Sequence, residues 1–201
     1  MKEIKILSIK RKAELSLRNN IIIRISKILM NPLKILNKIS QLLKNKKVKK
    51  INWSERSKKF GKYSVIDTQT PKEEFEHVTR IQKNILIKNL KKYLTGREKK
   101  ILDFGCGTGR FSKELSKISK KHKVVAVDTE KNLIDIAIPS KNVRYLHIKD
   151  LKEIKGKFDL IFIANVLGGL DKNKIFFVAN FLSNSLNKNG ILFLNENTDN
   201  N

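Results

Sequence analysis

The 201-residue sequence contains a single cysteine, Cys106, so no disulfide can form within the chain. Missing disulfides fit a reducing compartment, and we expect a cytoplasmic protein. No apolar run approaches the roughly 20 residues that a membrane-spanning helix needs. The opening MKEIKILSIKRKAEL has neither an apolar signal core nor a small-residue cleavage site, which argues against secretion. The three histidines show no metal-ligand spacing, so we assign no metal site.

Acidic residues are also scarce, because 19 Asp and Glu face 44 Lys and Arg and leave a formal charge of +25. The excess lies at the front, where the first 60 residues hold 18 basic side chains and three acidic ones. Such a field attracts anionic partners. The chain also favours Lys, Ile and Asn throughout, as a biased base composition would produce, so part of the charge need not reflect a partner. Both interpretations remain open.

Residues 1–50 predict a basic amphipathic helical arm. Apolar residues recur there in steps of three and four, and draw one stripe along a helix: Ile22, Ile25, Leu29, Leu33, Leu36, Ile39 and Leu43. Lysines lie among them, and Pro32 should kink or restart the helix. We expect the arm to lie on an anionic membrane surface, to contact RNA phosphates, or to pack on the neighbouring domain.

Residues 51–100 predict a polar lead-in followed by a helix. Thr70 and Pro71 are suited to the N-cap and first helical position, and apolar steps continue to about Leu90. The helix should end at Thr95-Gly96.

Residues 101–201 alternate short apolar runs with helical patterns. The strand candidates are KKILDF, KVVAVD, VRYLHI, FDLIFIAN and GILFLNEN, and the helices between them include FSKELSKIS, KNLIDIA and DKNKIFFVANFLSNSLNK. Strands that alternate with helices indicate a parallel sheet covered on both faces. We therefore predict an α/β, Rossmann-like, doubly wound domain.

The stretch DFGCGTGR joins the first of these strands to a helix. Gly105, Gly107 and Gly109 let the backbone pass close under a ligand. A dinucleotide loop, G-x-G-x-x-G, would need its third glycine where this chain has Arg110, which leaves a nicotinamide oxidoreductase as a remote alternative. Asp103 ends the strand just before the loop, and a carboxylate there favours a cofactor with an ammonium and a sulfonium. The charges point to S-adenosylmethionine.

With these residues, ILDFGCGTGRFS resembles the first motif of the class I S-adenosylmethionine-dependent methyltransferases, and the resemblance extends over about residues 100–195. It implies that Asp128, 19 residues after the last loop glycine, binds both ribose hydroxyls. It further implies that Asp150 contacts the adenine amino group and that Asn165 faces the ligand crevice.

Cys106 is a small residue that fits the cofactor loop, and we expect Arg110 to be a solvated residue of the first helical turn. The resemblance also implies that the region ahead of the domain, which here includes Trp53 and Tyr63, forms a lid over the donor. The pattern suggests no catalytic residue.

The chain departs from the family in two respects. Gly168-Gly169 stands where many relatives carry a His or an acid, and the sequence stops just past the fifth strand. The family sheet has seven strands, so we predict the order 3-2-1-4-5 without the last two, and an open edge at ILFLN.

We expect methyl transfer to a small-molecule or glycan acceptor. RNA methylation, or an impaired methyltransferase-like protein that binds or assembles with a partner through the open edge, is the alternative.

Overall fold

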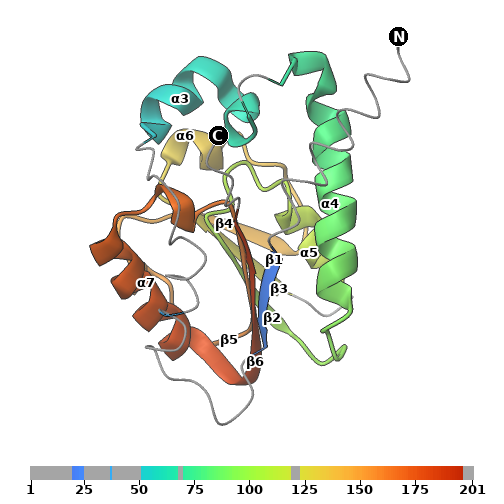
Figure 1. Ribbon diagram of the computed structural model, residues 1–201, viewed down its shortest axis with the longest axis vertical. Coiled ribbons are helices and arrows are strands. Elements are labelled where there is room, and N and C mark those ends of the chain that lie inside the picture. Colours follow the sequence, from blue (N-terminus) through green and yellow to red (C-terminus); the bar gives the residue numbers. More distant parts are fainter. Residues whose placement is uncertain (1–19, 25–36, 38–50, 68–69, 119–122, 197–201) are drawn as a thin grey trace.

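The computed structural model describes residues 20–24, 37, 51–67, 70–118 and 123–196, which form an α/β domain around one six-stranded sheet (Figure 1). The strands lie in the order β1-β6-β5-β2-β3-β4. Five of them are parallel: β2 (Lys100–Phe104), β3 (Lys123–Asp128), β4 (Val143–His147), β5 (Phe158–Ala164) and β6 (Leu186–Asn195). The predicted Rossmann-like fold and the 3-2-1-4-5 order of the parallel strands are therefore confirmed.

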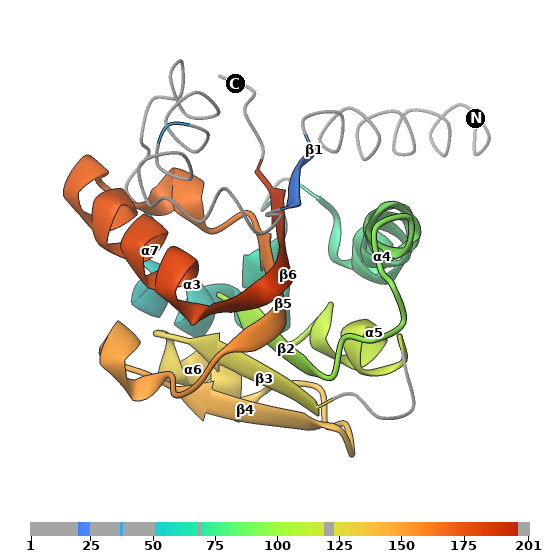
Figure 2. The ribbon, with the colours of Figure 1, turned by 90° about the horizontal axis from the view of Figure 1, so that it is seen from below.

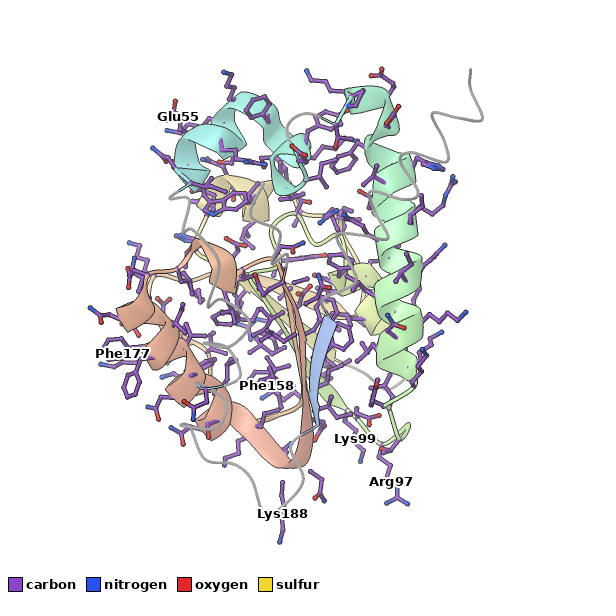
Figure 3. The ribbon with its side chains drawn as sticks, viewed as in Figure 1. Glu55, Arg97, Lys99, Phe158, Phe177 and Lys188 are labelled. Atoms are coloured by element: carbon purple, nitrogen blue, oxygen red, sulfur yellow. The ribbon has the colours of Figure 1, made fainter. Side chains whose placement is uncertain are left out.

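Helices cover both faces of the sheet, as the continuous apolar strands require. Helices α4 (Phe75–Lys91) and α5 (Ser112–Ser116) lie on one face, and α7 (Lys172–Ser185) lies on the other (Figure 2). Two apolar clusters follow from this layering. One joins α7 to the sheet through residues such as Phe158, which Figure 3 shows between helix and sheet, and the other joins α4 and α5 to it.

The second cluster is built around aromatic rings. Phe162 of β5 stacks on Phe193 of β6 with ring centroids 5.1 Å apart and an interplanar angle of 6°. The ring of Phe111, just before α5, lies 5.4 Å from that of Phe162. Each fully buried side chain of this kind contributes about 1.5–3 kcal/mol through the hydrophobic effect. The packing fixes α5, and with it the preceding glycine loop, over the ends of β2 and β5.

Strand β1 (Asn20–Arg24) corrects two predictions. It pairs antiparallel with β6, with Asn20 opposite Asn195 and Arg24 opposite Ile191. The predicted helical arm over residues 1–50 is therefore wrong at residues 20–24, because β-branched isoleucines there complete a sheet. The predicted open edge at ILFLN is wrong as well, since β1 occupies it. Apart from Asn37, the rest of the predicted arm lies outside the described residues.

Two helix ends also differ from prediction. Helix α4 begins at Phe75 after the 3-10 turn η2 (Lys72–Glu74), and neither turn nor helix has a side-chain cap, so Thr70 is not its N-cap. Helix α7 starts as predicted, with Asp171 capping Lys174 N at 2.8 Å, but it ends at Ser185 because Leu186 already belongs to β6. None of the helices within the described residues has the length and apolar character needed to cross a membrane.

Candidate functional site

The glycine loop predicted to bind the cofactor lies at the carboxyl edge of the sheet, directly after β2. The N–H groups of Gly105 and Cys106 both donate to the carbonyl oxygen of Val127, at 2.9 Å each. Because Val127 lies in β3, these bonds tie the loop to the neighbouring strand. A further bond from Gly109 N to Cys106 O, at 2.9 Å, closes the turn.

The glycines in this loop cannot be replaced without strain. Gly105 and Gly109 have φ of +71° and +73°, a left-handed conformation that other residues adopt at a cost of about 1–2 kcal/mol. A Cβ on Gly105 would overlap Val166 Cγ2, and a Cβ on Gly109 would overlap the ring and hydroxyl of Tyr145. The Tyr145 hydroxyl is itself held by a 2.7 Å hydrogen bond to Ile138 O.

Asp103 lies beneath the loop and is buried, with 3% of its surface exposed. Its Oδ2 accepts a 2.6 Å hydrogen bond from Ser112 Oγ. Burial raises the pKa of Asp103 to about 7, helped by the charge of Asp128 and opposed by Ser112 and the charge of Arg110. The carboxyl group is thus poised to ionise fully when a cation approaches.

Arg110 corrects the expectation, drawn from its place in the first turn of the helix, that it is solvated. The side chain is only 6% exposed, and its Nη1 donates to Oε1 of Gln82 in α4 at 2.9 Å. Its guanidinium also lies 5.0 Å from the centre of the Phe111 ring. Burial lowers the pKa of Arg110 to about 10, and the charge of Asp103 opposes that shift.

Asp128 ends β3 and faces the loop, where the resemblance places the ribose ligand. Its Oδ2 accepts from Gly107 N at 2.8 Å and its Oδ1 accepts from Glu130 N at 2.9 Å. Burial raises the pKa of Asp128, and these backbone N–H donors oppose the shift. Each carboxylate oxygen has a second lone pair, so the half-buried group can still accept two hydroxyl hydrogen bonds.

Cys106 is buried within the loop. Burial, reinforced by the charges of Asp103 and Asp128, raises the pKa of its thiol. A neutral, buried thiol is not a nucleophile. Cys106 therefore fills space in the loop, as its small size suggests.

Two predicted residues lie further out along the same edge. Asp150 is exposed, and its Oδ1 accepts from Lys152 N at 2.7 Å in a capping box with Glu153 that starts the turn η3 (Leu151–Glu153). Asn165 follows β5, is exposed, and has a left-handed φ of 57°. Its backbone N–H donates to Asn195 O at 2.8 Å. The structure thus brings Asp103, the loop and Asp128 together, with Asp150 and Asn165 on either side.

Glu196 is a residue that the sequence analysis missed. It follows β6, is 1% exposed, and accepts three backbone N–H groups, from Val166 at 2.8 Å, Leu167 at 2.9 Å and Gly168 at 3.1 Å. These belong to the turn η4 (Leu167–Gly169) after β5 and to the residue before it. Its position at the carboxyl end of a strand, like that of Asp103 and Asp128, is the signal that could have identified it.

The lead-in segment covers this edge (Figure 1). Helix α3 (Trp53–Phe60) and the turn η1 (Gly61–Val65) pack on α6 (Lys131–Asp135), and Ser57 Oγ accepts from Asn132 Nδ2 at 3.3 Å. Val65 lies over the loop, since a Cβ on Gly107 would be 2.9 Å from Val65 Cγ1.

Two further lead-in side chains hold this cover in place. Trp53 lies beside Gly169, with its Nε1 4.0 Å from where a Cβ of that glycine would be. Arg56 supports the segment internally through hydrogen bonds of 2.7 and 2.6 Å to the carbonyls of Ser64 and Ile66. The segment therefore spans both the loop after β2 and the turn after β5.

These residues fit the cofactor that the resemblance implies. The loop has no room for a Cβ at its glycines, two carboxylates end the adjacent strands, and both face the same loop. S-adenosylmethionine would meet Asp103 with its cationic end and Asp128 with its ribose. Within the described residues, no three His, Cys, Asp or Glu side chains gather in a way that could hold a metal ion.

Comparisons with known proteins agree with a methyltransferase fold. Residues 101–190 match a family model described as a methyltransferase domain. The chain is 30% identical over 148 residues to a malonyl-[acyl-carrier protein] O-methyltransferase of Legionella pneumophila, a match that covers 69% of this chain and 48% of that protein. It therefore spans about half the length of this relative.

Solved methyltransferases are also similar. PKMT2 from Rickettsia typhi in complex with AdoHcy is 29% identical, with a TM-score of 0.44, and the match covers 48% of this chain and 20% of that one. A DhpI-SAH complex is 19% identical, with a TM-score of 0.49 and coverage of 69% and 64%. The family match coincides with the sheet, the glycine loop and Asp128. Residues 101–190 therefore carry a methyltransferase domain of the class I S-adenosylmethionine-dependent type.

Proposed function

We propose that this chain is a cytoplasmic S-adenosylmethionine-dependent methyltransferase that acts on a small-molecule or glycan acceptor. The observation that carries the proposal is the 2.8 Å hydrogen bond between Gly107 N and Asp128 Oδ2. It sets the glycine loop and the ribose-binding acid side by side at the ends of two neighbouring parallel strands. Open α/β sheets bind their ligands at this edge.

Methyl transfer requires little of the protein beyond the correct placement of donor and acceptor. The donor supplies a methyl group on a sulfonium; an acceptor lone pair forms the new bond to carbon while the carbon–sulfur pair returns to sulfur. Aligning the two reactants and excluding water can provide most of the rate enhancement. Asp103 favours the cationic end of the donor, and Val65 and Trp53 cover the loop and the turn after β5. No side-chain nucleophile is required.

The position of the lead-in segment over the loop is an argument for a small acceptor. A cover that lies on both Gly107 and Gly169 leaves more room for a small molecule than for a folded RNA at the reacting end. The Legionella relative is named for an acyl group on a carrier protein, which favours a small acyl or similarly compact acceptor here. The excess positive charge of the first 60 residues suits an anionic acceptor. The alternative of a partner-binding protein loses its docking edge, because β1 occupies it.

The test is isothermal titration of the purified chain with S-adenosylmethionine and S-adenosylhomocysteine. We expect Asp128→Ala to weaken binding at least tenfold, because it removes an ionised acceptor of hydroxyl hydrogen bonds worth about 1.5–3 kcal/mol. Asp135→Ala is the matched control. Asp135 is an exposed acid on α6, ion-paired to Lys131 at 2.6 Å and outside the site. Circular dichroism checks that each variant folds.

Unchanged affinity in a folded Asp128→Ala chain would show that the donor site lies elsewhere. Binding by the wild type justifies a screen with radiolabelled donor against small-molecule, glycan and RNA acceptors. Label recovered in RNA alone would overturn the small-acceptor proposal while leaving the donor site intact.

A further inference from the structure

Arg110 is a buried cation without an anionic partner in the described part of the chain. Its one hydrogen bond there goes to the neutral amide oxygen of Gln82, at 2.9 Å. A guanidinium has five N–H donors, and a buried charge is costly unless it is paired. Arginine suits planar, two-pronged recognition of a carboxylate or phosphate. The side chain is therefore arranged for an anion that the described residues do not provide.

Asp103 is the complementary group on the same face of the sheet. In β2, Ile101 packs into the cluster under α4 and α5, and Asp103, two residues on, points to that face and bonds Ser112 of α5. Asp103 and Arg110 influence each other's ionisation, yet no ion pair within 4.0 Å joins them among the described residues. A buried carboxyl group and a buried guanidinium thus lie close enough to shift each other's pKa, but they form no ion pair among the described residues.

The neighbouring part of this face carries polar atoms without partners. Thr79 is one turn of α4 before Gln82, is 4% exposed, and its hydroxyl has no hydrogen bond within the described residues. Asn195 follows Phe193 by two positions in β6, so it points to the same face, and both of its amide atoms are unpaired there. Buried polar groups are rarely left unpaired, so they indicate a polar ligand at this end.

We propose that Arg110, oriented by Gln82, binds the α-carboxylate of the donor's amino-acid end while Asp103 faces its ammonium. This inference rests on the proposed function and deepens it. The amino-acid end of S-adenosylmethionine is a zwitterion, with a positive and a negative group on one carbon. A separated acid and guanidinium match both charges at once. Gln82 fixes the guanidinium plane and keeps its own amide N–H groups for the same carboxylate.

The test compares ligands with and without the charged groups of this end, and S-adenosylmethionine is the matched partner of its decarboxylated form because both carry the sulfonium. S-adenosylhomocysteine carries both charged groups, decarboxylated S-adenosylmethionine keeps only the ammonium, and 5′-methylthioadenosine lacks both. In isothermal titration, we expect Arg110→Met to weaken the binding of S-adenosylhomocysteine and S-adenosylmethionine at least tenfold. The affinity for the other two ligands should change less than twofold. Arg97→Met is the matched control, because Arg97 is exposed at the end of the sheet opposite the lead-in segment (Figure 3).

The outcomes separate this inference from the proposed function. Failure of the wild-type chain to bind any of these ligands would contradict both. Normal wild-type binding with an equal loss for all ligands in Arg110→Met, or with no loss, would overturn the role of Arg110 alone. Should Arg110→Met fail to fold, Arg110→Lys and Gln82→Leu take its place, and the same selective loss for S-adenosylhomocysteine, of at least threefold, is expected of each.

Discussion

The carboxyl edge of the sheet has two halves, the loop after β2 and the turn after β5, and a carboxylate from the neighbouring strand holds each of them. On the donor side, Asp128 at the end of β3 accepts Gly107 N from the loop after β2. On the other side, which the proposed function would give to the acceptor, Glu196 at the end of β6 accepts N–H groups of Val166, Leu167 and Gly168 after β5. In both, a carboxylate that ends one strand fixes the loop that follows its neighbour. Charge-assisted bonds of this kind are about twice as strong as neutral ones.

The two carboxylates differ in their capacity to accept further hydrogen bonds from a ligand. Asp128 is half-buried and keeps lone pairs for a ligand, whereas Glu196 is 1% exposed and serves three backbone donors. Under the proposed function, Asp128 therefore both holds the donor loop and binds the donor. The acceptor half is a scaffold whose turn carries Asn165 and Val166 against the donor loop.

The largest expected effect is in the donor half, at Gly109. Alanine there combines left-handed strain of about 1–2 kcal/mol with overlap on Tyr145. We therefore expect the free energy of unfolding to fall by about 2–5 kcal/mol and donor binding to be lost. Thermal unfolding and titration with S-adenosylhomocysteine measure both. Gly96→Ala is the control, because Gly96 has φ of +77° with nothing within 4 Å of a Cβ. Equal effects at both positions would mean that the Tyr145 contact is unimportant.

The next effect is in the acceptor half. Glu196→Ala leaves three backbone N–H groups unpaired, two of them buried, and we expect it to lower stability by about 2–4 kcal/mol and to reduce kcat with little change in donor affinity. Glu153→Ala is the comparison, because the exposed Glu153 accepts Lys149 N and Asp150 N at 2.7 and 2.8 Å. We expect it to cost less than 1 kcal/mol. A donor affinity that falls as much as kcat would erase the distinction between the two halves.

The smallest effect concerns the edge beside the acceptor half. Successive residues of an antiparallel edge strand point their N–H groups alternately toward and away from the partner. Of Ile22→Pro and Ile23→Pro, only one removes a hydrogen bond to β6, and we expect it to be less stable than the other by about 1 kcal/mol in chemical unfolding. Equal stability of the two variants, with both like the wild type, would contradict the β1–β6 pairing.

Features that depend on neighbouring residues could be predicted. Apolar runs bounded by turns gave β2 to β6, and the spacing from the loop glycines to Asp128 gave the donor side, because both are written in contiguous sequence. Arg110 was misjudged because its environment comes from α4, 28 residues earlier. Residues 20–24 were assigned to a helix because an isoleucine-rich stretch fits the periodicity of a helix as well as that of a strand. Only the edge of β6, with which these residues pair, decides between the two.

By itself, the sequence determined the α/β alternation, the glycine loop and the acids that end its strands, since backbone conformation and strand burial follow from local residue types. The tertiary structure alone decided that β1 closes the sheet, that Glu196 holds the turn after β5, and that Arg110 is buried against Gln82 of α4. Each of these depends on a partner far away in the chain. Long-range pairing is chosen by which unsatisfied edge, N–H group or charge lies within reach after the chain has folded.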